Sequence, residues 1–150
     1  MSRTQLEMLA DLAREARDQA GIALAQERQG EQQTTAQLNS LKRYRAEYAE
    51  RLQQAMREGI DPATMYNYQQ FLGSLDAALD RARHTLAAQQ KRVEKRQQHW
   101  QQEQRKLSSY DTLTSRRLVE EHRRLERYEQ KTNDDLVTSR LARQRNETPQ

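Results

Sequence analysis

The sequence has no cysteine, and its 150 residues include only two prolines, four glycines, one phenylalanine and one tryptophan. The absence of cysteine excludes a disulfide framework and thiolate chemistry, which agrees with a cytoplasmic protein. So few prolines and glycines argue against a loop-rich β fold. No run of about 18 apolar residues occurs, so the sequence predicts no helix that spans a membrane.

The residues that are abundant favour helices. Gln, Arg, Ala, Leu and Glu dominate the chain, and all of them are good helix formers. Hydrophobic residues make up 34% of the sequence and charged residues 32%, which is too little apolar surface for a thick globular core at this length. This composition fits paired helices that share one narrow apolar seam.

One strong break interrupts the helical sequence, at Gly59-Ile60-Asp61-Pro62. Gly59 lets a helix end because it tolerates positive φ, Asp61 can cap the next helix, and Pro62 fits the first helical position. A turn this short makes the two helices antiparallel. We therefore predict a first helix at about 4–58, a turn at 59–61, a second helix at about 62–140 and a tail over 141–150, where Pro149 and the loss of apolar spacing argue against order.

Each predicted helix has a seam, a line of mostly apolar residues that are alternately three and four positions apart, as in heptads. The first seam is Leu6, Leu9, Ala13, Ala16, Ala20, Leu24, Glu27, Glu31, Thr34, Leu38, Leu41, Arg45, Tyr48, Leu52 and Ala55. The second is Met65, Tyr68, Leu72, Leu75, Leu79, Ala82, Leu86, Gln89, Val93, Arg96, Trp100, Glu103, Leu107 and Tyr110, followed by Leu118, Glu121, Leu125, Tyr128, Thr132 and Asp135. Each seam contains one stutter, near residue 20 and after residue 110. Residues 1–150 are thus predicted to form a single all-α domain, an antiparallel coiled-coil hairpin whose second helix is the longer.

The polar middle of the first seam and the unequal helix lengths lead to two further expectations. Glu27, Glu31 and Thr34 predict a weak or bent section around residues 27–35. With the turn near residue 60, the numbers of facing residues should sum to about 120. Residues beyond about 115 then have no partner within the chain.

The tip of the hairpin is rich in aromatic residues at positions that flank the seam. The heptad assignment places Tyr44 and Phe71 beside the seam, where coiled coils usually carry charge. We expect an exposed apolar strip of Tyr44, Phe71 and Ala78, widened by parts of Leu41 and Leu75, and such strips mark partner sites. The alternative is that these residues are only broad core packing.

Other patterns carry little chemistry. Residues 81–106 hold eight Lys or Arg against two Glu, a local net charge of +6, which suits a solvated face, an acidic protein or, less well, nucleic acid. His99 and Glu103 have the i, i+4 spacing of a metal pair, but no third ligand converges on them. No Gly-rich phosphate loop, nucleophile–base set or paired-carboxylate cleft is apparent, so the sequence predicts neither an enzyme nor a cofactor.

The segment Asn67-Tyr68-Gln69-Gln70-Phe71 after a Gly-Ile turn, with Tyr44 and Tyr48 upstream, resembles the FliJ family of the bacterial flagellar type III export apparatus. The likeness covers nearly the whole chain, although outside this segment it consists mostly of residue patterns that coiled coils share. It implies a stalk, similar to a rotary ATPase γ subunit, that binds a hexameric export ATPase and promotes its assembly. It also implies contact with the cytoplasmic part of the membrane export gate and handover of export chaperones, at the inner membrane of the flagellar base.

The resemblance also implies roles for particular positions. Export-gate binding would fall on Phe71, Leu75 and Ala78, and a second tip cluster for partner binding on Gln37, Leu41, Tyr44 and Tyr48. Where the family can have a His one turn after Ala78, this chain has Ala82. We expect the ATPase to dock where apolar spacing continues without a partner, together with the start of the first helix, at Leu6, Leu9, Leu118, Leu125 and Tyr128. The alternative function is that of a basic coiled coil that binds nucleic acid or serves as a general scaffold.

Overall fold

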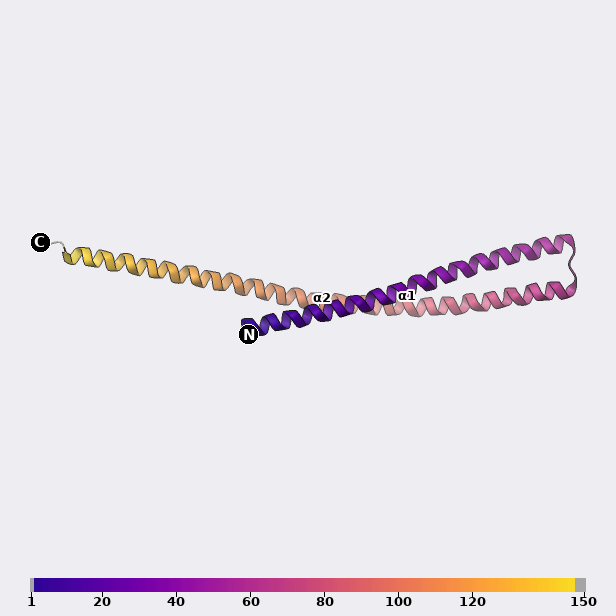
Figure 1. Cartoon of the computed structure of the whole chain (residues 1–150), viewed down its shortest axis with the longest axis horizontal. Helices are drawn as coiled ribbons and strands as arrows, with labels where there is room; N and C mark the ends of the chain where they lie inside the picture. The colour runs from indigo at the N-terminus through magenta and orange to yellow at the C-terminus, as the bar shows by residue number, and fades with distance from the viewer. Residues whose placement is uncertain (1, 148–150) are drawn as a thin grey trace. The chain divides into compact units, whose positions relative to one another are not determined.

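The chain forms two long α-helices joined by a short turn, and the computed structural model describes residues 2–147 (Figure 1). Helix α1 spans Arg3–Glu58 and helix α2 spans Pro62–Glu147, with 56 and 86 residues. The two helices pack against each other, and no strand occurs within residues 2–147. The predicted all-α antiparallel hairpin with a longer second helix is confirmed.

The helix ends follow local chemistry, with one departure from the prediction. Among the described residues, Gly59 is the only one with positive φ, at 93°, and it follows directly after the last residue of α1. At the other end, α2 continues to Glu147, so the tail predicted to begin at residue 141 is wrong for residues 141–147. Ala, Arg, Gln and Glu in this stretch are good helix formers, and extending a helix that already exists adds one hydrogen bond for each residue fixed. The rest of the predicted tail lies outside the described residues.

The chain divides into two compact units, and each of them contains part of both helices. One unit is Glu15–Gln104, which includes the turn; the other is Met1–Arg14 with Arg105–Gln150. Within the first unit, Arg45 pairs with Asp76 and Glu27 with Arg92, so the numbers of facing residues sum to about 120 as predicted. That the whole chain is a single domain stays a prediction.

The seam between the helices keeps its three- and four-residue steps without the predicted stutters, apart from Arg96 of α2, which is exposed although its spacing placed it in the seam. At the first predicted stutter, in α1, Arg17 is half-buried and occupies the seam position, whereas Ala16 is exposed. In α2 the steps continue through Tyr110, Thr114, Arg117 and Glu121, all of them half-buried, whereas Leu118 is 50% exposed. The prediction was wrong here because it assigned seam positions to apolar residue types. The long stem of an arginine can also lie in a seam while its charged head reaches water. The guanidinium of Arg17 does this, and donates a 3.4 Å hydrogen bond to Gln104 Oε1.

The core is a thin line of small and aliphatic side chains. Its buried hydrophobic members are Leu6, Ala10, Ala13, Ala20, Leu24, Leu38, Leu75, Leu79 and Leu107. Gly21 makes room for the seam residue Trp100, whose indole nitrogen lies 3.3 Å from where a Cβ would stand. Thr34 is buried, but α1 is uninterrupted through residues 27–35, where the predicted weakness stays a prediction.

Candidate partner-binding surfaces

The turn holds the beginning of α2 through Asp61. The Asp61 carboxylate accepts hydrogen bonds from the hydroxyl of Thr64, at 2.5 Å, and from its backbone N–H, at 3.4 Å. These bonds, above all the one from the hydroxyl, lower the pKa of Asp61 below its usual value. The predicted N-cap is therefore formed, and it fixes the direction in which the aromatic residues of the first turns of α2 project.

Three aromatic rings pack across the two helices close to this turn. The centroids of the Tyr48 and Phe71 rings are 4.2 Å apart, and those of Tyr48 and Tyr68 are 6.2 Å apart. The guanidinium of Arg51 lies over the Tyr48 ring, 5.2 Å from its centroid. Aromatic contacts of this kind add stabilisation beyond the buried area, so Tyr48 holds Phe71 in one orientation.

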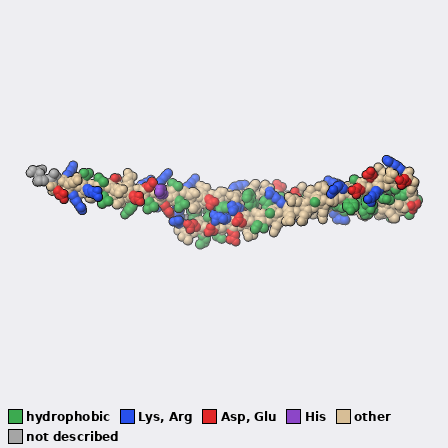
Figure 2. Space-filling view, turned by 45° about the horizontal axis from the view of Figure 1, so that its top comes forward, with side chains coloured by type: hydrophobic (Ala, Val, Ile, Leu, Met, Phe, Trp, Pro, Cys, Tyr) green, Lys and Arg blue, Asp and Glu red, His purple; other side chains and the backbone are tan. Residues whose placement is uncertain are grey.

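The residues predicted to form the tip strip differ in exposure. Tyr44 is 56% exposed and Phe71 40%, so both present apolar surface to the outside (Figure 2 shows hydrophobic side chains gathered near the turn). Ala78 is half-buried, and Leu75 is only 9% exposed. Leu75 is thus core, and any partner would reach it only at its edge. Of the second predicted cluster, Gln37 is exposed, whereas Leu41 and Tyr48 are half-buried.

An ion pair that the sequence did not reveal lies one turn from this strip. Arg45 Nε and Asp76 Oδ1 are 2.5 Å apart, and the second nitrogen–oxygen pair is at 3.4 Å. The hydrogen bond lowers the pKa of Asp76 and raises that of Arg45. Because Arg45 occupies a seam position, this pair favours one register of the two helices over its neighbours.

The basic stretch of α2 is partly neutralised within the hairpin. Arg92 Nε lies 3.2 Å from a carboxylate oxygen of Glu27, and Arg83 pairs with Asp80 at 3.5 Å. Within residues 2–147 no cluster of His, Cys, Asp or Glu could hold a metal ion. The pair His99 and Glu103 therefore gains no third ligand from the fold.

The predicted ATPase-binding residues belong to the unit that contains both chain ends. Leu6 is 4% exposed, because it packs beside Thr114, Arg117 and Leu118 of α2. Leu9 is half-buried. Leu118, Leu125 and Tyr128 are 50%, 61% and 71% exposed. The structure therefore separates these residues: Leu6 holds the helices together, and the three α2 residues are open to a partner.

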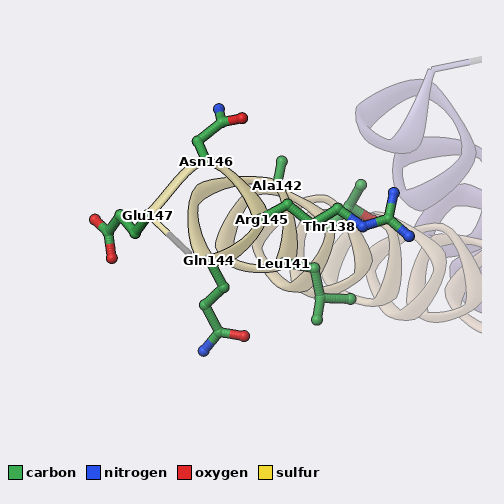
Figure 3. Close-up of a pocket in the computed structure, with 7 residues that line it drawn as sticks. All are labelled: Thr138, Leu141, Ala142, Gln144, Arg145, Asn146 and Glu147. Atoms are coloured by element: carbon green, nitrogen blue, oxygen red, sulfur yellow. The ribbon is translucent and has the colours of Figure 1, made fainter. Parts of the chain in front are cut away.

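From His122 to Glu147 every side chain of α2 is exposed. At the end of this segment, Gln144, Asn146 and Glu147 point in three different directions from the helix (Figure 3). This segment is therefore a single helix exposed on all sides. Neither helix, over residues 2–147, has a stretch long and apolar enough to cross a membrane.

A two-helix hairpin with an aromatic tip and an uncovered helical segment belongs to the coiled-coil class of proteins. Comparison with known proteins then gives the family: the family model described as "Flagellar FliJ protein" matches residues 1–146, and the chain belongs to this family of non-catalytic flagellar proteins. The flagellar FliJ protein of Salmonella typhi is 32% identical over 132 residues, covering 88% of this chain and 90% of the relative. That of Escherichia coli K12 is 30% identical with the same coverage.

Proposed function

We propose that the chain is a non-enzymatic stalk component of the flagellar type III protein export apparatus. In this role it binds the hexameric export ATPase and promotes its assembly in the cytoplasm, at the inner-membrane face of the flagellar base. Its tip contacts the cytoplasmic part of the export gate and takes part in the handover of export chaperones. Family membership supports the flagellar setting, and the uncovered segment of α2 is the observation that carries the stalk role.

The argument from the uncovered segment is energetic. Leu125 and Tyr128 lie on one face of α2 and are more than half exposed, so their side chains contribute little burial free energy to the folded chain. Burying apolar surface stabilises a complex by about 25 cal/mol per Å². A protein partner that covers this face therefore gains free energy without disturbing the paired part of the hairpin. Leu118 extends this face, and the half-buried Leu9 is included in the proposed docking surface.

At the tip, Phe71, Ala78 and Tyr44 supply the surface for the export gate and for chaperones. Phe71 is already oriented by the ring of Tyr48, so little conformational freedom is lost when a partner covers it. Leu75, buried beneath, supports this surface rather than forming it. Gln37 and Leu41 extend it along α1.

The test uses the purified export ATPase from the same organism. The double change Leu125→Ala and Tyr128→Ala should abolish stimulation of ATP hydrolysis and hexamer formation, while circular dichroism stays as in the unchanged chain. The matched control is Gln130→Ala with Asp134→Ala, because these exposed residues lie on the opposite face of the same segment. The stalk assignment fails if the Leu125 and Tyr128 variant stimulates as well as the control.

A further inference from the structure

A groove runs along one flank of the hairpin in the Glu15–Gln104 unit. Its volume is about 830 Å³, enough for several side chains of a partner. The groove is lined by Gln33, Ala36, Gln37, Ser40, Leu41, Tyr44, Ala78, Arg81, Ala82 and Thr85. It therefore begins at the tip strip and continues away from the turn along both helices.

The shape of this groove suits a third helix. Ala36 and Ser40 lie one turn apart on α1, and Ala78 and Ala82 lie one turn apart on α2. Short side chains at these four positions let another backbone approach closely, whereas larger residues would hold it away. Tyr44, 56% exposed, adds an aromatic surface at the tip end. Amphipathic helices bind grooves of this kind through apolar residues three and four positions apart.

The charge in the groove selects among such helices. Arg81 is the one ionised side chain in the lining at neutral pH, and no carboxylate accompanies it. Within residues 2–147, Arg81 forms no hydrogen bond or ion pair. Arg83, two residues further along the same helix, is instead engaged with Asp80 at 3.5 Å. An exposed guanidinium with no acidic neighbour in an otherwise apolar and amide-lined groove attracts a carboxylate from a partner.

We propose that this groove binds an acidic amphipathic helix of a partner protein, with an Asp or Glu of that helix paired to Arg81. The inference rests on the proposed role of the tip as a partner-binding surface and deepens it by naming the chemistry of the bound segment. Leu41, Tyr44 and the small residues receive the apolar face of the helix. Arg81 fixes its register and excludes basic helices.

The first test measures binding of the full chain to the purified cytoplasmic part of the export gate. Arg81→Ala should weaken binding by about tenfold, and Arg81→Glu by far more, because it adds repulsion to the lost pair. Arg81→Lys should recover part of the loss. Arg83→Ala and Arg83→Glu are the matched controls, since Arg83 does not line the groove, and they should change binding less than about twofold.

A photo-crosslinking amino acid at position 85 identifies the bound segment. Thr85 lines the groove, whereas His84 beside it does not and serves as the control position. The peptide crosslinked at position 85 should carry more Asp and Glu than Lys and Arg and have helical apolar spacing. A neutral or basic peptide, or equal effects of the Arg81 and Arg83 variants, would overturn the inference.

The two failures are distinguishable. If Tyr44→Ala and Phe71→Ala weaken gate binding while Arg81→Glu leaves it unchanged, the tip is a partner site but the acidic-helix inference is wrong. If none of these changes affects binding, both the inference and the proposed role of the tip fail.

Discussion

Two parts of the continuous helix α2 differ completely in burial. From Met65 to Glu121, buried or half-buried residues recur every three or four positions except at the exposed Arg96, because α1 lies alongside. From His122 to Glu147, every side chain is exposed, although Leu125, Tyr128 and Leu136 still follow helical spacing. Apolar residues at helical spacing therefore indicate a helix face that is suited to burial. They do not indicate whether this chain itself buries that face.

The largest expected effect comes from removing the uncovered part altogether. Deleting residues 122–150 should abolish stimulation of the export ATPase, whereas the melting temperature of the remaining hairpin should change little, because Glu121 is the last half-buried residue. A shorter deletion, of residues 142–150, keeps Leu125 and Tyr128 and should retain stimulation. Normal stimulation by the longer deletion would show that this segment is not the docking site.

Two leucine substitutions measure the difference in burial directly. Leu79 is 3% exposed, and Leu79→Ala should lower the free energy of unfolding by about 2–4 kcal/mol through lost packing and the cavity left behind. Leu125→Ala, at 61% exposure, should change it by no more than about 0.5 kcal/mol. Urea denaturation followed by circular dichroism tests both. Similar losses at the two positions would mean that the outer segment is covered in solution, for example by a second copy of the chain.

Phe71 lies between these extremes. With 40% of the residue exposed and its ring 4.2 Å from that of Tyr48, Phe71→Ala should destabilise the hairpin by about 1–2 kcal/mol, less than a fully buried phenylalanine. Binding to the export gate should fall by a larger free energy, about 2 kcal/mol or more, if Phe71 becomes desolvated in the complex. Isothermal titration calorimetry beside thermal melts compares the two. A loss of binding that only follows the loss of stability would assign Phe71 to the core.

Glycine substitutions probe the turn against the helix interior. Gly59 has φ of 93°, so Gly59→Ala should destabilise the hairpin by about 1 kcal/mol, through strain rather than lost contacts. Gly73 is helical with open space around its Cβ position, so Gly73→Ala should stabilise it by a similar amount, about 1 kcal/mol. Opposite shifts in the urea midpoint are expected. Shifts of the same sign would contradict the described turn.

The smallest expected effect concerns pH. The hydrogen bond from Arg45 lowers the pKa of Asp76. The pair therefore contributes stability that is present at neutral pH and is lost as the pH falls below the usual aspartate pKa of about 4. Asp76→Asn should therefore flatten the dependence of stability on pH in that acidic range. Asp134→Asn, in the exposed segment, is the control and should leave the dependence unchanged. Equal profiles for both variants would show that the pair is not formed in solution.

The hairpin could be predicted from the sequence because its signals are local. Gly59, Asp61 and Pro62 act within a few residues of the turn, and the register follows from counting outwards from it. The seam was harder to place, because residue type competes with spacing: Ala16 and Leu118 look like core residues, yet Arg17 and Arg117 occupy those steps. Helical order at residues 141–147 was missed because no apolar spacing marks it.

The candidate surfaces were predicted only in part, because they depend on contacts across the two helices. Tyr44 and Phe71 were expected to be exposed from their heptad positions, and they are. The packing of Phe71 on Tyr48 and the pairing of Arg45 with Asp76 need the three-dimensional register. Arg81 looked like one of eight basic residues, and only the groove distinguishes it. A cross-helix charge count at paired positions would have been the one sequence signal for it.

The constant sum of facing residue numbers has a consequence for how such a chain can change over evolutionary time. A residue inserted into α1 would rotate the side chains beyond it by about 100° out of the seam, and a single matching insertion in α2 would restore the axial alignment but not the facing of the two seams. Length changes between the turn and Glu121 should therefore arise in compensating pairs, most readily of seven residues in each helix. Beyond Glu121 the residues of α2 need not stay aligned with α1, so related sequences should differ in length mainly there.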